Sequence, residues 1–344
     1  MFIFENIPLS TLSTMRLGGN ARYVTDVNNR KDVEEAYRWA KGKSLPIIMI
    51  GQGSNIIWGD KGYDGLILVN KMLGYEVFEE DDENIYVTVG AGEIWDSVVE
   101  RTVEDGFSGI EQLSMIPGTA GATPVQNVGA YGVEIADVLT TVEAFDTKDG
   151  KFVTIMASDC ELSYRSSMFK TSRKNRYLIT AVTLRLNHKK IEPPFYGALE
   201  KYFNDNNIHE YSSRIIRDAV VEIRSNKLPD PQFVANVGSF FHNPIVDNRD
   251  ALAILNQYEN MPHWEVDNGK TKLSAAWLIE KSGFKDYHDK ETGMATWSKQ
   301  PLVFVNENGV STHSLLVFRD KIANKVKKQF GVTLNQEPEI LGNI

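Results

Sequence analysis

The chain has 344 residues, of which 42% are hydrophobic and 24% charged, and its formal net charge at pH 7 is −9. This composition is typical of a soluble globular protein, and the length indicates two or three domains. The negative charge argues against a general nucleic-acid binder. A single cysteine, Cys160, excludes an internal disulfide framework and a cysteine-rich metal site. We predict no metal site.

The N-terminal region predicts a strand, a helix and a second strand. Residues 23–25 read as a short strand, and Asn29 or Asp32 is placed to cap the helix that follows. The apolar positions of that helix keep helical spacing: Val33, Ala36, Tyr37 and Ala40. Residues 46–50 form an apolar strand that leads directly into a glycine loop, residues 51–55. A Rossmann fold places such a loop after the first strand and before a helix, so this order argues against one.

The middle of the chain is rich in predicted strands. Residues 65–69 and 85–89 are separated by an acidic stretch, residues 79–83, which we interpret as a solvated hairpin tip. A helix over residues 95–102 ends near Gly106. Three more strands are expected over residues 138–145, 151–155 and 177–186.

The last part of the chain has a different character. Residues 191–207 contain prolines and read as a polar interruption, and a helix over 215–224 leads to a domain entry at 227–231. Two further helices are expected, one over 274–281 and a later one that ends at Gly331.

A central loop, residues 116–132, contains four glycines and two prolines. Small residues let backbone amides come close to a ligand, above all to its phosphates. An ordinary surface turn is the alternative. Gln126, Asn127 and Tyr131 place polar groups among residues too small to shield them, and the loop at 51–55 has the same character. The pair of loops favours a phosphate-bearing ligand.

Six separate motifs together resemble the UDP-N-acetylenolpyruvoylglucosamine reductase family, also called UDP-N-acetylmuramate dehydrogenase. They occur in the family's order at residues 51–55, 117–132, 164–170, 227–231, 238–244 and 337–339. A further segment, residues 195–199 with Tyr196, resembles the tyrosine loop of the longer of the family's two subtypes. The resemblance implies an α+β fold of the vanillyl-alcohol-oxidase (PCMH) type. It also implies two FAD-gripping subdomains, residues 1–70 with 331–344 returning to the active site and residues 71–213, and a C-terminal α+β substrate domain, residues 214–330.

The resemblance also implies the reaction and its partners. FAD would carry hydride from NADPH to the enolpyruvyl ether of UDP-N-acetylglucosamine, giving UDP-N-acetylmuramate for peptidoglycan synthesis, with NADPH and substrate using one pocket in turn. All six histidines lie beyond the two glycine loops and Cys160 is distant in sequence, so we expect non-covalent FAD. The N-terminus has no signal-peptide pattern and no apolar run spans a bilayer. We therefore expect a cytoplasmic protein without membrane partners, and the negative charge argues against nucleic-acid partners. We expect a monomer, because no obvious amphipathic surplus calls for a partner.

The same resemblance assigns roles to individual residues. Arg165 and Glu339 would flank the enolpyruvyl carboxylate, and Ser239 would donate the proton. The cofactor-binding residues would be Gly51, Gly53, Ser54, Asn55, Ile116, Gly118, Gly121, Ala122, Thr123 and Gly129. The substrate-binding residues would be Tyr164, Tyr196, Arg224, Lys227 and Asn243. Each of these, taken singly, could instead be an ordinary surface or turn residue.

Two positions depart from the family pattern. Ala122 stands where members can carry serine, so a side-chain contact to the flavin is lost unless Thr123 supplies it. Leu341 follows Ile340 where a basic residue can occur. Two alternatives remain open at this stage: a flavin oxidase of the same fold, and a non-catalytic nucleotide-sugar or flavin-binding module.

Overall fold

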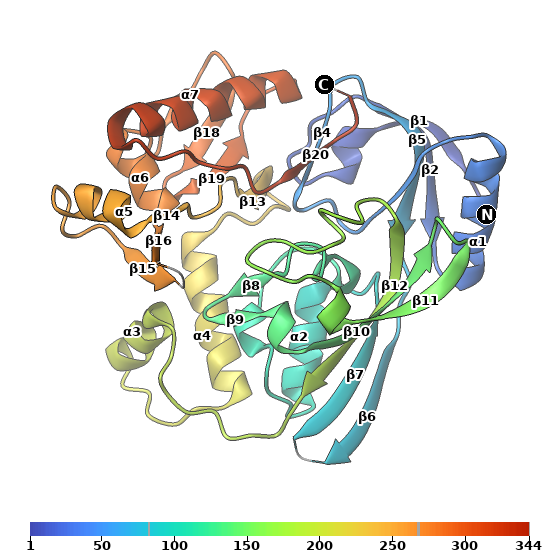
Figure 1. Cartoon of the computed structure of the whole chain (residues 1–344), viewed down its shortest axis with the longest axis horizontal. Coiled ribbons are helices and arrows are strands. Elements are labelled where there is room, and N and C mark those ends of the chain that lie inside the picture. Colours follow the sequence, from blue (N-terminus) through green and yellow to red (C-terminus); the bar gives the residue numbers. More distant parts are fainter. Residues whose placement is uncertain (82, 267–268, 344) are drawn as a thin grey trace. The chain divides into compact units, whose positions relative to one another are not determined.

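The computed structural model describes residues 1–81, 83–266 and 269–343 (Figure 1). The chain forms two compact units. Unit 1 comprises Met1–Ile7, Ala21–Gln52 and Asp64–Asn226, and unit 2 comprises Pro8–Asn20, Gly53–Tyr63 and Lys227–Ile344. The three-domain division expected from the family resemblance stays a prediction. Among the described residues, no helix combines the length and the hydropathy that crossing a membrane requires.

A four-stranded sheet begins unit 1, in the order β1-β2-β5-β3. Its strands are β1 (Phe4–Pro8), β2 (Asn20–Val27), β5 (Tyr63–Asn70) and β3 (Ile47–Ile50). Helix α1 (Arg30–Gly42) begins where the Asn29 side chain accepts the N–H of Asp32, and its buried apolar residues pack against Leu66 and Leu68 of β5. The predicted strand, helix and strand are confirmed.

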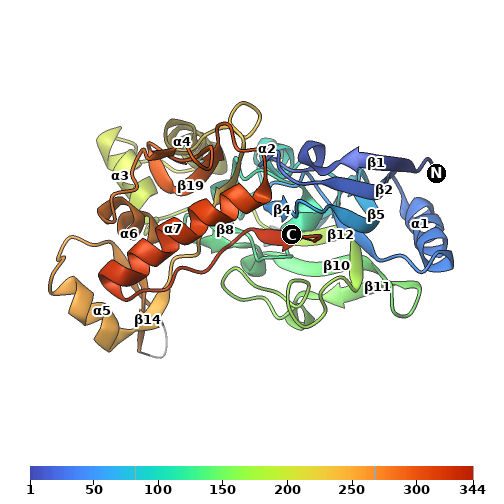
Figure 2. The same cartoon turned by 90° about the horizontal axis from the view of Figure 1, so that it is seen from above.

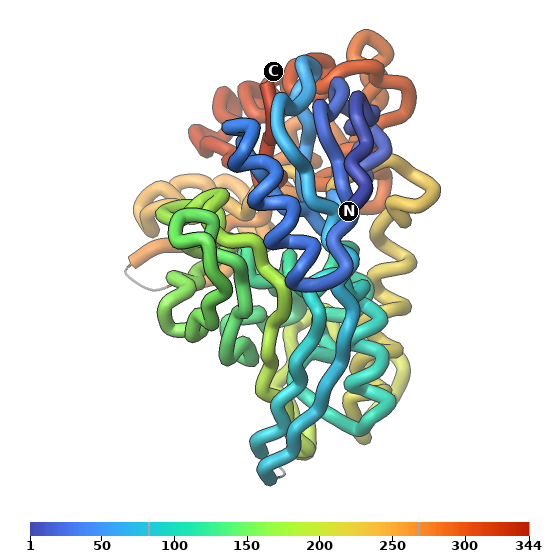
Figure 3. Tube along the Cα trace, turned by 90° about the vertical axis from the view of Figure 1, so that its right-hand side faces the viewer, coloured from blue at the N-terminus to red at the C-terminus, as the bar shows by residue number. Residues whose placement is uncertain are grey.

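The larger sheet of unit 1 is antiparallel, in the order β11-β10-β12-β7-β6. Its strands are β6 (Tyr75–Asp81), β7 (Asn84–Gly90), β10 (Leu139–Asp146), β11 (Lys151–Met156) and β12 (Tyr177–Leu186). Alternate residues of β7 are buried against α2 (Trp95–Glu104). Figure 3 shows β6 and β7 running side by side. Glu79 and Glu80 lie in β6, so the predicted hairpin tip begins later than expected, and Asp82 lies outside the described residues.

Two helices follow this sheet: α3 (Gly197–Asp205) and α4 (Ser213–Lys227). The polar interruption predicted for residues 191–207 is wrong over α3. Only Leu199 and Phe203 are buried there, one turn apart, and they pack against Ile216 and Val220 of α4. Two apolar positions are too few for a clear helical period in the sequence.

Unit 2 contains a four-stranded sheet, β13-β19-β18-β17, and a three-stranded sheet, β14-β16-β15. Its strands are β13 (Asn236–Ser239), β14 (Ile245–Asp247), β15 (His263–Val266), β16 (Lys270–Leu273), β17 (His288–Asp289), β18 (Met294–Trp297) and β19 (Gln300–Asn306). The helices are α5 (Asn248–Leu255), α6 (Ala275–Lys281) and α7 (Thr312–Phe330). Figure 2 shows the length of α7, which ends at Gly331 in a left-handed conformation, as predicted.

The C-terminal strand β20 (Glu339–Leu341) pairs in parallel with β4 (Ile56–Trp58), the strand that follows the first glycine loop. A short hairpin of β8 (Gly129–Ala130) and β9 (Val133–Glu134) ends the central loop. The 3-10 turns are Leu9–Leu12, Glu111–Leu113, Ala120–Ala122, Ile135–Asp137 and Ala157–Asp159.

Candidate functional site

The two glycine loops are joined within unit 1. The N–H of Gly118 donates to Oε1 of Gln52 at 3.0 Å. A Cβ on Gly51 would lie 2.2 Å from Oγ1 of Thr119, so only glycine allows this approach. Small residues therefore bring the backbones of both loops together.

The start of helix α2 holds the central loop from the other side. The N–H of Trp95 donates to the carbonyl of Gly118 at 3.0 Å, and the N–H of Gly121 donates to the carbonyl of Ala91 at the same distance. A Cβ on Gly121 would lie 2.4 Å from the Cβ of Ala91. Backbone hydrogen bonds thus fix this side of the loop.

The remaining cofactor candidates of this loop differ in exposure. Ile116 is half-buried, Ala122 is exposed, and Thr123 is 2% exposed. The Thr123 hydroxyl donates to the carbonyl of Ala120 at 2.7 Å. Toward a flavin, Thr123 could therefore act only as a hydrogen-bond acceptor, so it replaces a serine at position 122 incompletely.

Four non-glycine residues in or near this loop have left-handed backbone conformations. Their φ angles are 57° for Met115, 47° for Asn127, 50° for Tyr131 and 53° for Arg165. Each such residue costs on the order of 1 kcal/mol and persists only where its surroundings hold it. Functional sites are one place where such residues occur.

Asn127 ties three segments of the site together. It is 1% exposed, and its Nδ2 donates to Oε2 of Glu134 at 2.7 Å and to the carbonyl of Ser163 at 3.1 Å. Its Oδ1 accepts the N–H of Ala136 at 2.9 Å. Asn127 therefore helps to attach the segment that carries Arg165 to the central loop.

Arg165 lies against the end of the central loop. Its Nη2 donates to the carbonyl of Gly129 at 2.7 Å, and its Nη1 donates to the carbonyl of Asn127 at 3.4 Å. Its guanidinium carbon lies 5.3 Å from the ring centroid of Tyr164. These contacts fix a positive charge beside the loop.

Arg224 lies at the opposite end of the loop. Its Nη2 donates to the carbonyl of Met115 at 3.2 Å, while its buried Nε makes no hydrogen bond among the described residues. Burial lowers the pKa of Arg224, and a contact with the hydroxyl of Tyr131 opposes that effect. A buried donor of this kind fits an anionic ligand.

Tyr131 is a site residue that we did not assign from the sequence. Its ring packs edge to face on Tyr196 with centroids 5.9 Å apart, and burial raises the pKa of both phenols. Tyr131 thus connects Tyr196 with Arg224. The sequence feature that could have identified Tyr131 is its polar hydroxyl within a loop of small residues.

Unit 2 carries the other half of the first glycine loop. Gly53 has a φ of 69°, and a Cβ there would lie 2.1 Å from the carbonyl oxygen of Leu12. Ser54 and Asn55 are half-buried. The N–H of Glu339 donates to the carbonyl of Asn55 at 3.1 Å, so the C-terminal strand places Glu339 beside this loop.

Ser239 and Glu339 lie on neighbouring segments of unit 2. Ser239 ends β13 opposite Val303 of β19, and the N–H of Glu337 donates to the carbonyl of Phe240 at 2.9 Å. Phe240, which follows Ser239, is therefore hydrogen-bonded to Glu337, which lies two residues before Glu339. This pairing connects two of the predicted catalytic residues.

Asn243 and Lys227 also belong to unit 2. Oδ1 of Asn243 accepts the N–H of Ala275 at 3.0 Å, which orients its Nδ2 as the group that can donate elsewhere. Lys227 ends α4, and its carbonyl accepts Nε1 of Trp297 at 3.1 Å. Since Arg165 lies in unit 1, its predicted meeting with Ser239 and Glu339 stays a prediction.

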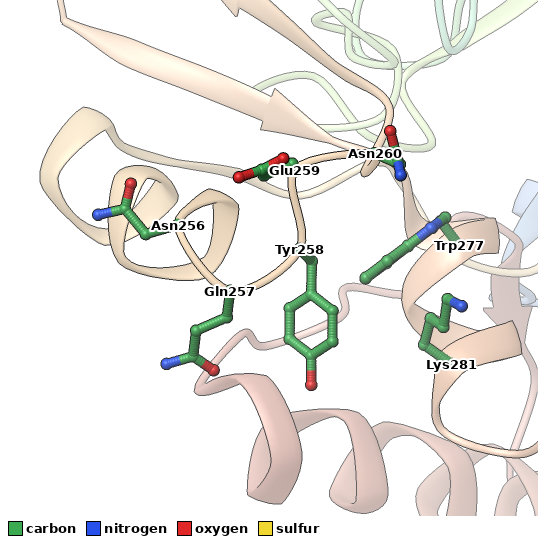
Figure 4. Close-up of a pocket in the computed structure, with 7 residues that line it drawn as sticks. All are labelled: Asn256, Gln257, Tyr258, Glu259, Asn260, Trp277 and Lys281. Carbon is green, nitrogen blue, oxygen red and sulfur yellow. The ribbon is translucent and has the colours of Figure 1, made fainter.

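A separate cavity of about 350 Å³ lies in unit 2 (Figure 4). Its lining residues are Asn256, Gln257, Tyr258, Glu259, Asn260, Trp277 and Lys281. None of the predicted site residues is among them, and most of these side chains are exposed. We do not assign the reaction to this cavity.

Comparison with known proteins identifies two family models in the chain. A model described as an FAD binding domain matches residues 21–156. A model described as the C-terminal domain of UDP-N-acetylenolpyruvoylglucosamine reductase matches residues 230–341. The first covers the whole central loop, residues 116–132, and the second covers Ser239, Asn243 and Glu339.

Curated relatives match over nearly the whole chain. A UDP-N-acetylenolpyruvoylglucosamine reductase from Amoebophilus asiaticus is 40% identical over 341 residues, which is 99% of this chain and 100% of the relative. The chain belongs to the UDP-N-acetylenolpyruvoylglucosamine reductase family. The reductase of this name from Pseudomonas aeruginosa is 34% identical over 336 residues, 98% of each chain. The predicted family is confirmed; the longer subtype stays a prediction.

A solved structure of a family member has the same fold. The UDP-N-acetylenolpyruvylglucosamine reductase from Thermus caldophilus gives a TM-score of 0.67 at 21% identity, covering 99% of this chain and 100% of that one. The predicted α+β, FAD-binding fold is confirmed, and the chain is an FAD-containing oxidoreductase. Its two glycine loops fit this cofactor, because Gly51 and Gly121 stand where a Cβ would collide with neighbouring atoms.

Proposed function

We propose that the chain reduces UDP-N-acetylenolpyruvoylglucosamine to UDP-N-acetylmuramate, with NADPH as the reductant, in peptidoglycan synthesis. The observation that carries the proposal is the placement of two arginines at the two ends of the central loop. Arg165 donates to the carbonyl of Gly129, and Arg224 donates to the carbonyl of Met115. The substrate of this reaction has a carboxylate and a diphosphate, which are two anionic groups for two fixed cations.

The glycine loops hold FAD without a covalent bond in this proposal. Residues 51–55 and 116–132 contain neither histidine nor cysteine. When bound, FAD supplies the capacity to accept hydride from NADPH and deliver it to the substrate. NADPH and substrate occupy one pocket in turn.

Arg165 and Glu339 lie beside the enolpyruvyl carboxylate in the proposed complex. Addition of hydride to the terminal vinyl carbon leaves negative charge on the carbon that bears the carboxylate. The fixed guanidinium of Arg165 stabilises that charge because its contacts to the loop hold it in place before the reaction.

Ser239 donates the proton that completes the reduction. A serine hydroxyl is a poor acid in water, so the transfer requires a strongly basic enolate and exclusion of solvent. Ser239 is half-buried at the end of β13, where its backbone is paired with β19. The rigid strand supports a defined position for the hydroxyl.

The remaining assigned residues bind the substrate. We assign the nucleotide and its phosphates to Tyr164, Tyr196, Arg224, Lys227 and Asn243. The buried Nε of Arg224 and the oriented Nδ2 of Asn243 are the donors that support this assignment. We further propose a cytoplasmic monomer that acts on small molecules and not on nucleic acid or membranes.

Replacement of Ser239 by alanine tests the proposal. After anaerobic reduction with NADPH, the variant is mixed rapidly with the enol ether and the return of flavin absorbance is followed. We expect reoxidation to slow by about 100-fold, which is typical when a general acid is lost. The exposed Ser172 provides a control variant, Ser172→Ala, with wild-type reoxidation expected. Reoxidation of Ser239→Ala at the wild-type rate would contradict the assigned role.

A further inference from the structure

Helices α2 and α4 of unit 1 face each other through charged side chains. One face of α2 carries Asp96, Glu100 and Glu104, spaced by one turn each. Arg214 of α4 lies 3.7 Å from Glu104, and Arg217 lies 3.6 Å from Glu100. Arg217 also donates to both carboxylate oxygens of Asp96, at 2.7 and 3.2 Å. The two helices are therefore antiparallel along this face.

The Asp96–Arg217 pair is less exposed to water than its neighbours. The side chains of Arg217 and Asp96 are 7% and 33% exposed, whereas those of Arg214 and Glu104 are 49% and 58% exposed. Burial by itself raises the pKa of Asp96, but hydrogen bonds from Arg217 and the N–H of Met115 hold it below its ordinary value. Asp96 is therefore ionised at neutral pH.

Met115 is held at both ends by charged side chains. Its N–H donates to Oδ1 of Asp96 at 2.6 Å, and its carbonyl accepts from Arg224 at 3.2 Å. Its backbone has the left-handed conformation noted above, which methionine adopts only under constraint. The next residue is Ile116, where the central glycine loop begins.

We propose that Asp96 is a positioning residue for the cofactor: by accepting the N–H of Met115, it fixes the left-handed turn from which the FAD-binding loop starts. Arg217 keeps Asp96 in place, and Arg224 holds the opposite end of Met115. The proposal rests on the proposed function, because it takes the central loop as the FAD site.

Three variants separate this role from general stability. Asp96→Ala removes the acceptor of the Met115 N–H. Asp96→Asn keeps a carbonyl oxygen that can accept it but loses the negative charge. Glu104→Gln removes an ion pair between the same two helices without contacting Met115. For each, the apoprotein is titrated with FAD by the quenching of flavin fluorescence, and its melting temperature is measured.

We expect Asp96→Ala to weaken FAD binding by about tenfold or more, because the N–H of Met115 then has no acceptor to fix the turn. Asp96→Asn is expected to recover most of that affinity, although its melting temperature falls with the ion pair. Glu104→Gln is expected to bind FAD as the wild type does. Equal affinity of Asp96→Ala and the wild type, or equal loss in the alanine and asparagine variants, would overturn the proposal.

A measurement on the wild type keeps the test independent of the folding of these variants. If Asp96 fixes the start of the loop, hydrogen exchange at the Met115 N–H should slow by about tenfold or more when FAD binds, because the bond to Asp96 then opens less often. An unchanged exchange rate would overturn the proposal. A wild-type protein that takes up no FAD would instead contradict the proposed function.

Discussion

Nη2 of Arg165 donates to the carbonyl of Gly129 at 2.7 Å, across 36 positions of sequence. Both residues lie in unit 1, and Asn127 attaches the two segments to each other. The guanidinium is thus placed by the backbone of the same loop that we assign to FAD. If the two assignments are right, the position of the cofactor and the charge that we assign to the substrate carboxylate depend on one piece of structure.

Replacement of Gly129 by alanine should lower kcat. The new Cβ would lie 2.8 Å from Cγ of Glu134, 3.0 Å from the carbonyl oxygen of Val133 and 3.2 Å from Nη1 of Arg165, so these neighbours must shift. We expect a loss of about tenfold in kcat, since small displacements of a positioning group are costly in catalysis. Steady-state kinetics provide the measurement. Gly42→Ala is the control, because a Cβ at Gly42 meets nothing within 4 Å.

Replacement of Asn127 by alanine should destabilise the protein. Three hydrogen bonds of a buried amide are lost, one of them the bond donated to Glu134. We expect a fall of about 2–3 kcal/mol in the free energy of unfolding, measured with urea. Asn206→Ala, which removes one exposed hydrogen bond to the carbonyl of Tyr202, should change it by less than about 0.5 kcal/mol. Similar values for the two variants would contradict the bridging role of Asn127.

Replacement of Tyr131 by phenylalanine should raise KM for the UDP substrate without a matching loss in kcat. The variant keeps the ring contact with Tyr196 but loses the hydroxyl that faces Arg224. We expect KM to rise by about tenfold, because Arg224, which we assign to the substrate phosphates, is then held less firmly. Tyr202→Phe is a control, since its hydroxyl bonds to the exposed Glu222. A change in kcat alone would contradict a binding role.

Replacement of Asp146 by asparagine should destabilise the protein in a pH-dependent way. Hydrogen bonds from Arg176, at 2.6 to 3.1 Å, hold the pKa of this buried carboxyl below its ordinary value. Such a group stabilises the fold above its unfolded pKa of about 3.9 and loses the effect as pH falls through the lower folded value. The difference in unfolding free energy between wild type and variant should be constant above about pH 5 and shrink below about pH 4. A difference that grows on acidification would contradict this assignment.

The parts of the fold that sequence could predict depend on local patterns. The N-cap of α1 at Asn29 and the end of α7 at Gly331 are set by residues adjacent to the helices. Helix α3 was not predicted, because its burial depends on α4 and involves only two of its side chains. The two glycine loops could be recognised from composition alone, because small residues are what allow a backbone to approach a ligand closely.

The missing parts of the site depend on contacts between distant positions. Asn127 and Ser163 are 36 residues apart, and Asp96 and Arg217 are 121 apart. Neither pair forms a motif, and each side chain alone resembles an ordinary polar residue. The left-handed conformation of Met115 is likewise invisible in a sequence, because methionine carries no signal for it.

The measurement that tests the central claim most directly is an anaerobic visible spectrum of the purified protein, to which NADPH and then UDP-N-acetylenolpyruvoylglucosamine are added. We predict a bound-flavin spectrum that bleaches with NADPH and recovers with the enol ether. Recovery with oxygen alone, and none with the enol ether, would indicate an oxidase. A colourless protein that takes up no added FAD would contradict the account altogether.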